Sequence, residues 1–227
     1  MTNKEFVEIL KNIATNYKTL YVIGCFGAPM TPANKTRYIN NGAHGNYNAR
    51  SDRTAMINAA TADTFGFDCV CLIKGVLWGW NGDVSRIYGG AKYTANGVPD
   101  IGADAMINVC KNVSADFDNL EIGEAVWCAG HIGVYIGDGL AVECTPSWKN
   151  CVQITACNRT ISGYNRRNWL KHGKLPYITY VKENSLEADL DVLARNKVIN
   201  SPEYWKATAP KVKHLPELIH NMAEKLK

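Results

Sequence analysis

The spacing of apolar residues changes along the chain and predicts a mixture of helices and strands. Apolar residues at helical spacing predict an amphipathic helix over about residues 3–17, and a β-like run follows at Thr19–Gly27. Residues 28–64 are polar and rich in Asn, Gly and Ala, which predicts a long insertion that forms a lid or rim. Further helices are expected at about 52–62, 69–80 and 103–111.

From Glu124 onward, apolar and polar residues alternate, as they do in half-buried strands. Short strands separated by turn residues are typical of a small antiparallel sheet. Together with the helices, they place the chain in the α+β class. The expected strands are Ala125–Cys128, His131–Ile136, Leu140–Cys144, Val152–Thr155 and Ile178–Val181.

After Tyr180 the pattern returns to helical spacing, and Ser201-Pro202 followed by Glu203 is a good helix start. We therefore expect a boundary near residue 183, with one main domain at 1–183 and a small helical segment at 184–227. The three helices expected in this segment lie at 185–195, 202–207 and 215–226.

Composition excludes several classes of protein. The formal net charge of +4 is too small to indicate nucleic-acid binding. The chain has eight cysteines, but with 227 residues it is too long to need a disulfide scaffold, so most are expected to be reduced core residues. No C-x-x-C pair occurs, and Cys128-x-x-His131 has no matching second pair, so we expect no metal and no cofactor.

The N-terminal region shows helical spacing and no basic-then-apolar signal pattern. The most apolar stretch, Val70–Trp80, contains Lys74 and is too short to span a bilayer. We therefore expect a protein that is made in the cytoplasm and is not embedded in the membrane. If it acts outside the cell, something else must release it.

Cys69 is the first candidate for chemistry. Asp68 is a good N-cap, so Cys69 is expected in the first turn of the next helix. Unpaired backbone N–H groups and the helix dipole lower the pKa of a thiol there, and a thiolate is a competent nucleophile. The alternative is that Cys69 is only a small buried residue on an apolar helix.

The second candidate is a hairpin that turns at Gly137-Asp138-Gly139. A three-residue loop pairs residue 136 with 140, 134 with 142 and 132 with 144, which gathers the apolar side chains on one face. A two-residue loop would instead place Glu143 among them, which its desolvation cost disfavours.

The selected pairing puts His131 and Glu143 on the same face, with Gly133 leaving open space between them. Glu143 can then orient the imidazole and stabilise its protonated form, which is the role of the third member of a catalytic triad. The alternative is a histidine–glutamate pair that serves packing alone.

These residues resemble a known family. Phe67-Asp68-Cys69 before an apolar helix is similar to the nucleophile motif of the NlpC family of papain-like cell-wall peptidases, also called the p-sixty family. The segment 130–137 resembles that family's base strand, and the segment 123–127 resembles the strand before it. Glu143 matches its third polar residue, and Tyr21 is similar to its tyrosine near the oxyanion site.

The resemblance implies a papain-like domain in which the helix that bears the nucleophile packs on a central antiparallel sheet. It implies a triad of Cys69, His131 and Glu143, and bacterial peptidoglycan stem peptide as substrate. It leaves open whether the enzyme is an endopeptidase or a muramoyl-L-alanine amidase, and the related CHAP amidases share the order of motifs. The sequence departs from the family at Cys71, which stands where glycine is usual, and in the long segment after Tyr21.

Other residues complete the expected site. Trp148, just past Glu143, is expected at the rim of the cleft, and His44 in the insertion is either a substrate contact or part of a solvated loop. His172 is expected in a surface turn.

The tail, 184–227, resembles helical segments at the ends of phage-type wall hydrolases. Its role is open between wall binding, self-association and packing on the catalytic domain. A phage-type lysin would fit the absence of a signal peptide. Two rival functions are a cysteine hydrolase or acyltransferase with another substrate, and a module that binds wall without catalysis.

Overall fold

The computed structural model describes residues 1–181 and 186–226. The chain divides into two compact units, Met1–Tyr180 and Val181–Lys227. The boundary that we expected near residue 183 lies outside the described residues. Within the described ranges, no helix has both the length and the apolar character needed to cross a membrane.

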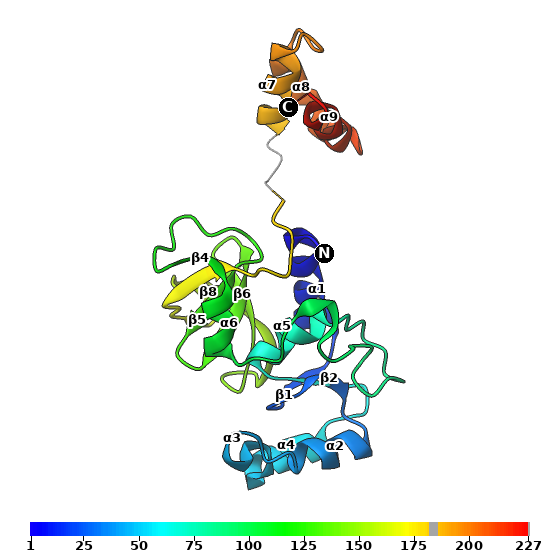
Figure 1. Ribbon diagram of the computed structural model, residues 1–227, viewed down its shortest axis with the longest axis vertical. Helices are drawn as coiled ribbons and strands as arrows, with labels where there is room; N and C mark the ends of the chain where they lie inside the picture. Colours follow the sequence, from blue (N-terminus) through cyan, green and yellow to red (C-terminus); the bar gives the residue numbers. More distant parts are fainter. Residues whose placement is uncertain (182–185, 227) are drawn as a thin grey trace. The chain divides into compact units, whose positions relative to one another are not determined.

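The first unit is a mixed α+β structure with two sheets (Figure 1). Its helices are α1 (Asn3–Asn16), α2 (Pro32–Ile39), α3 (Ala43–Asn46), α4 (Ser51–Ala59), α5 (Cys69–Leu77) and α6 (Ala103–Val109), with 3-10 turns at Tyr47–Ala49 and Ala95–Gly97. Its strands are β1 (Thr19–Tyr21), β2 (Phe26–Pro29), β3 (Phe65–Phe67), β4 (Lys111–Ser114), β5 (Ala125–Cys128), β6 (His131–Gly137), β7 (Leu140–Thr145), β8 (Cys151–Cys157), β9 (Arg166–Arg167) and β10 (Lys171–Lys174).

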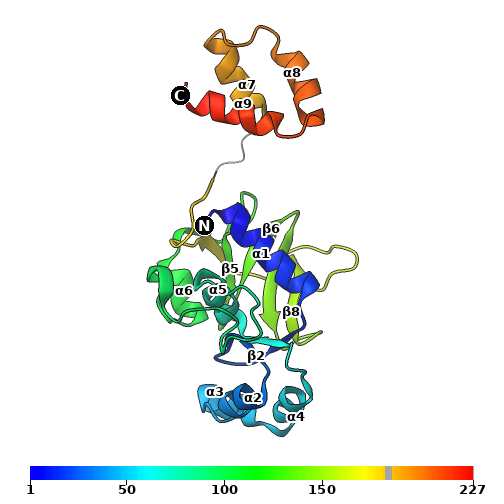
Figure 2. The ribbon, with the colours of Figure 1, turned by 90° about the vertical axis from the view of Figure 1, so that its right-hand side faces the viewer.

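The large sheet has the strand order β4-β10-β5-β6-β7-β8-β9, and only the β8–β9 pair is parallel. Helices α1, α5 and α6 pack on the face that carries Ile132, Val134 and Val142, and they form the main core with it (Figure 2). The opposite face carries a smaller apolar cluster that includes Val126 and Trp169. The predicted helix 69–80 is therefore present against the sheet, although it ends at Leu77.

The hairpin of β6 and β7 differs in detail from the prediction. Val134 pairs with Val142 as expected, but Gly137 rather than Ile136 faces Leu140, and a bulge lies between Tyr135 and Gly137. The loop thus has two residues, Asp138 and Gly139, both with positive φ, as a type I′ turn requires. The bulge adds the residue that a two-residue loop lacks, so the apolar face stays intact.

The insertion 28–64 contains more structure than predicted. We expected one helix near 52–62, whereas α2, α3 and α4 all form there, gathered beyond the small sheet β1-β3-β2 (Figures 1 and 2). Helix α2 begins with Thr31 as N-cap and Pro32 in the first turn, which is a common helix start. The prediction missed it because it judged this segment by its polar composition. Helices α2 and α4 share a separate core with the chain around β2, made of Val22, Cys25, Ala28, Met30, Tyr38 and Ile57.

Two expectations near the end of the first unit were wrong. Ile178–Val181 is not a strand, because Thr179 makes only an isolated bridge to Thr2. The strand is β10, and His172, which we expected in a surface turn, is buried within it. The polar sequence conceals this strand because its histidine is buried through a hydrogen bond to the Glu124 carboxylate.

The second unit contains α7 (Leu186–Arg195), α8 (Pro202–Thr208) and α9 (Leu215–Glu224), with a 3-10 turn at Ala209–Lys211. Ser185, the expected start of the first of these helices, lies outside the described residues. The three helices enclose a small core of their own, made of Leu190, Val192, Leu193, Ala209, Ile219 and Ala223.

Candidate active site

Asp68 fixes the start of the helix that carries Cys69. One carboxylate oxygen accepts a hydrogen bond from the Cys71 backbone N–H at 2.7 Å, which makes Asp68 the predicted N-cap of α5. The other oxygen accepts from the Gly24 backbone N–H, also at 2.7 Å. A single side chain therefore joins the turn after β1 to the first turn of α5, and Cys69 is the first residue of the helix.

The thiol of Cys69 is buried, and its pKa is raised to about 12. Desolvation is the largest cause and the charge of Asp68 adds to it, whereas backbone N–H groups of Ile132, Val70 and Cys69 act in the opposite direction. The lowered pKa that we expected from the helix terminus is therefore wrong for this state of the molecule. Burial and a neighbouring carboxylate outweigh the helix end.

His131 and Glu143 meet across β6 and β7. The His131 Nε2 atom lies 2.6 Å from one Glu143 carboxylate oxygen. The Thr155 hydroxyl donates to the other oxygen at 2.7 Å. The Glu143 side chain has 0% of its surface exposed, so every hydrogen bond to it comes from the protein.

Arg167 is the functional candidate that sequence reasoning missed. Its Nη2 atom donates to Glu143 at 2.8 Å and to the Thr145 hydroxyl at 3.0 Å, and its Nε atom lies 3.1 and 3.2 Å from the two Glu143 oxygens. It lies in β9, a two-residue strand beside β8. The only sequence signal was an arginine pair, Arg166-Arg167, just before Trp169.

The charge of Glu143 is maintained by these partners. Desolvation acts to raise the pKa of its carboxyl, but the hydrogen bonds and charges of His131 and Arg167 outweigh that effect and hold the pKa below its usual value. Glu143 is thus a buried carboxylate at neutral pH. It can stabilise a positive charge on the imidazole of His131.

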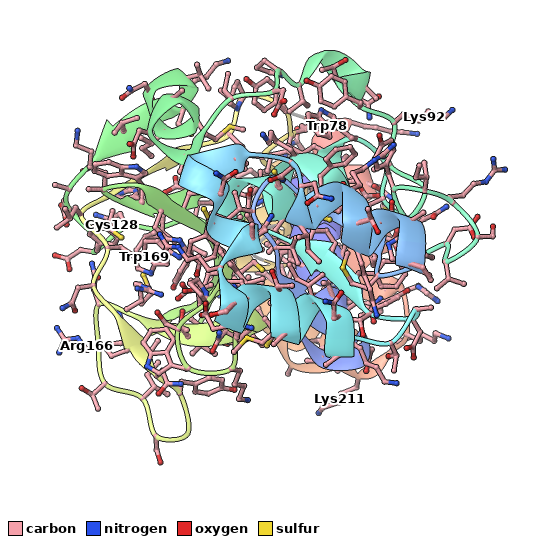
Figure 3. All side chains as sticks on the ribbon, turned by 90° about the horizontal axis from the view of Figure 1, so that it is seen from below. Trp78, Lys92, Cys128, Arg166, Trp169 and Lys211 are labelled. Carbon is pink, nitrogen blue, oxygen red and sulfur yellow. The ribbon has the colours of Figure 1, made fainter. Side chains whose placement is uncertain are left out.

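Two tryptophans line this region. The ring of Trp169 is stacked on His131, with centroids 5.5 Å apart and an interplanar angle of 8°. It fills the space above Gly133 that we expected to be open, because a Cβ atom there would lie 3.1 Å from the indole. Figure 3 shows Trp169 beside Cys128, with which it shares the apolar cluster on this face of the sheet. Trp148 is 47% exposed, and Arg167 lies 4.7 Å above its ring.

Tyr21 lies near Cys69 and is held by the insertion. Desolvation is the main cause that raises the pKa of the Tyr21 phenol, and the charge of a Cys69 thiolate would raise it further. The hydroxyl therefore stays protonated. The Arg53 guanidinium donates to the Tyr21 carbonyl and, at 2.7 Å, to the Asn150 side chain. Arg53 is only 3% exposed, and it ties α4 to β1 and to the loop after Trp148.

A cavity of about 320 Å³ opens at the N-terminus of α5. His44 from the insertion is among its lining residues, whereas Cys69, His131 and Glu143 are not. The other lining residues are Gly24, Phe26, Asp68, Val70, Cys71, Lys74, Tyr93, Asp100, Ile101 and Gly102.

The structure thus brings His131 and Arg167 into direct contact with Glu143. It places Cys69, the first residue of α5, beside the Ile132 N–H near the start of β6. Among the described residues, the Cys69 thiol makes no direct hydrogen bond to His131. Within the same residues, no group of three or more His, Cys, Asp or Glu side chains is arranged to hold a metal ion.

Comparison with known proteins gives little further information. No known family matches the sequence, and no curated protein matches it. A solved structure that resembles the chain is NlpC2 from Trichomonas vaginalis, at 14% identity and a TM-score of 0.36. The match covers 74% of this chain but spans only 46% of the length of that one. The chain is a mixed α+β protein with a weak similarity to an NlpC structure.

Proposed function

We propose that the chain is a papain-like cysteine hydrolase of NlpC type that cleaves peptide or amide bonds in bacterial peptidoglycan. The observation that carries the proposal is the buried carboxylate of Glu143, 2.6 Å from His131 Nε2, on strands that pack against the helix starting at Cys69. A nucleophile, a base and a group that orients the base are the parts that covalent hydrolysis requires.

The mechanism follows from the state of each group. Because the Cys69 thiol is protonated at neutral pH, His131 removes its proton as the sulfur attacks the substrate carbonyl carbon. With Nε2 bonded to Glu143, the imidazole uses Nδ1 for this transfer. Contacts of this kind often tighten only when substrate is bound.

The remaining steps reuse the same groups. The imidazolium protonates the leaving amine as the C–N bond breaks, and the acyl group stays on sulfur. Water then attacks this thioester with His131 as base, which releases the acid and restores the thiol. The Cys69 backbone N–H and the neutral Tyr21 hydroxyl are proposed to bind the oxyanion.

The substrate class rests on the resemblance of the sequence motifs to wall peptidases. One structural feature is compatible with it, the exposed Trp148 beside Arg167. The proposed partner is therefore peptidoglycan. Wall binding and self-association remain proposals for the unit Val181–Lys227.

Mass spectrometry of purified Gram-positive peptidoglycan tests the proposal. The wild type should release soluble fragments whose masses identify the cleaved bond, and Cys69→Ala should release none. Cys71→Ala is the matched control, because Cys71 is another buried thiol on the same helix and should leave activity in place. Release by Cys69→Ala, or by no protein on several wall types, would contradict the proposal.

A module that binds wall without cleaving it is the second candidate, and the raised pKa of Cys69 favours it. Co-sedimentation with insoluble wall separates the two functions. A binding module sediments with the wall and releases nothing, and its binding is unchanged in Cys69→Ala. A hydrolase loses its product release in that variant.

A further inference from the structure

We infer that Arg167 is a positioning residue that keeps Glu143 ionised and correctly directed at His131, an inference that rests on the proposed hydrolase function. Arg167 contacts both oxygens of the Glu143 carboxylate through Nε and Nη2, at 2.8–3.2 Å. The carboxylate is fully buried, and His131 occupies one of the same two oxygens. Removing Arg167 therefore changes the charge and the direction of the carboxylate that His131 contacts.

The position of Arg167 is fixed from several sides. Its Nη2 atom also donates to the Thr145 hydroxyl at 3.0 Å. Its guanidinium lies 4.7 Å from the Trp148 ring and 5.9 Å from the Trp169 ring, within the range of cation–π attraction. Trp169 is in turn stacked on His131, so one indole ring lies against both Arg167 and His131, the two ring or guanidinium partners of Glu143.

The charge of Arg167 has a consequence whose sign can be stated. An ionised Glu143 without Arg167 would have only the imidazole to neutralise it, because Thr155 contributes an uncharged hydroxyl. The His131–Glu143 pair would then take up a proton at higher pH, whichever of the two groups carries it. Arg167 opposes this by balancing the charge of the Glu143 carboxylate, which it contacts at both oxygens.

The other titratable groups near the pair do not replace Arg167. The neighbouring elements contribute the thiols of Cys69 on α5, Cys128 on β5 and Cys157 on β8, all with raised pKa values and therefore uncharged at neutral pH. The charge of Asp104 raises the pKa of the Cys128 thiol, and the charge of Arg159 lowers that of the Cys157 thiol. Asp104 is itself held by the Trp127 indole N–H and the Gly130 N–H.

The test is an NMR titration of the His131 imidazole in the full chain, with its signal assigned by its loss in His131→Asn. Arg167→Gln should move the pH of half-protonation of the pair upward by about one pH unit, since a neighbouring charge has been lost. Arg167→Lys keeps the charge and should stay near the wild type. Glu143→Gln should move the midpoint in the opposite direction. Arg166→Gln, an exposed neighbour, is the control and should have no effect.

Shifts of the titration midpoint in opposite directions in Arg167→Gln and Glu143→Gln would support the inference. If each substitution only disordered the site, both midpoints would move towards the same value. No shift in Arg167→Gln, or the same shift in Arg167→Lys, would overturn it. The titration needs no substrate, so it can succeed even if the protein releases nothing from peptidoglycan. If the protein is active, the acidic limb of its pH–rate profile should move in the same direction.

Discussion

At the residue scale, Asp68 has two opposed effects on Cys69. It begins the helix that presents the thiol, and its charge is the second cause of the thiol's raised pKa. The fold therefore positions the Cys69 thiol with the same side chain that makes this thiol harder to ionise. This opposition can be measured.

Asp68→Asn should increase the alkylation rate of Cys69 by iodoacetamide by about tenfold at pH 8. The amide keeps an oxygen that can cap the helix but removes the negative charge, so the thiol pKa falls. In the wild type, the rate should keep rising through pH 10, because the pKa is about 12. Peptide mapping must resolve Cys69 from the partly exposed Cys110, Cys128 and Cys151. Equal rates in the two proteins would show that the charge of Asp68 has no effect on the thiol.

Glu143 makes stability depend on pH. The pKa of its carboxyl is lower in the folded chain than its ordinary value of 4.5, so its stabilising effect is complete above about pH 4.5 and is lost as pH falls through the lower folded value. Glu143→Gln removes this dependence. Urea unfolding between pH 3 and pH 6 should show a steeper loss of stability in the wild type than in the variant. Parallel curves would contradict the assignment.

At the element scale, the packing of α5 against β2 depends on one glycine. A Cβ atom on Gly75 would lie 2.7 Å from the Phe26 carbonyl oxygen. Alanine normally stabilises a helix interior relative to glycine by about 1 kcal/mol, so this contact must reverse the usual sign.

Gly75→Ala should therefore lower the stability of the first unit, by about 1–3 kcal/mol, as overpacking does. It should also slow alkylation or turnover at Cys69, because α5 has to shift. Gly102→Ala is the control, since a Cβ atom there meets nothing within 4 Å. Thermal melting of the three proteins measures the difference, and a higher melting temperature for Gly75→Ala would disprove the tight contact.

Arg53 is one of the residues that attach the insertion to β1 and to the loop before β8. Arg53→Met should cost roughly 2–4 kcal/mol, because two charge-assisted hydrogen bonds are lost and a buried carbonyl is left without its donor. Hydrogen exchange should speed up in α2 and α4 and in the loop before Asn150. Arg50→Met, an exposed neighbour on the same segment, should leave exchange unchanged. Unaltered exchange in Arg53→Met would mean that Arg53 does not hold the insertion in place.

At the scale of the whole molecule, the two units have separate cores. The apolar cluster of the second unit contains only residues from Leu186 onward, and the main core contains none of them. Units without a shared core should unfold independently.

A chain shortened to residues 1–180 should keep the melting temperature of the first unit within about 2 °C, because every described residue of its main core lies within that range. It should also keep hydrolysis of soluble stem peptides under the proposed function. A loss of sedimentation with intact wall would then assign wall binding to the second unit. A large drop in melting temperature would show that the second unit supports the first.

The sequence by itself determined the local features of this protein. The spacing of apolar residues and the helix-capping residues predicted α1, α5 and the strands β5 to β8, because helix caps and alternating burial depend on residues only a few positions apart. The same alternation predicted the contact between His131 and Glu143, because it fixes which face of the sheet each side chain occupies. It did not predict the turn, which has two residues and a bulge in place of the expected three-residue loop.

Only the tertiary structure decided what surrounds those residues. Arg167 reaches Glu143 from a strand 24 positions later, and β10 is recognisable only once His172 meets Glu124. The raised pKa of Cys69 likewise depends on burial by distant segments, which outweighs the local effect of the helix terminus. Spacing along a chain encodes neighbours within one turn or hairpin, whereas desolvation and long-range charge pairs depend on which segments the fold brings together.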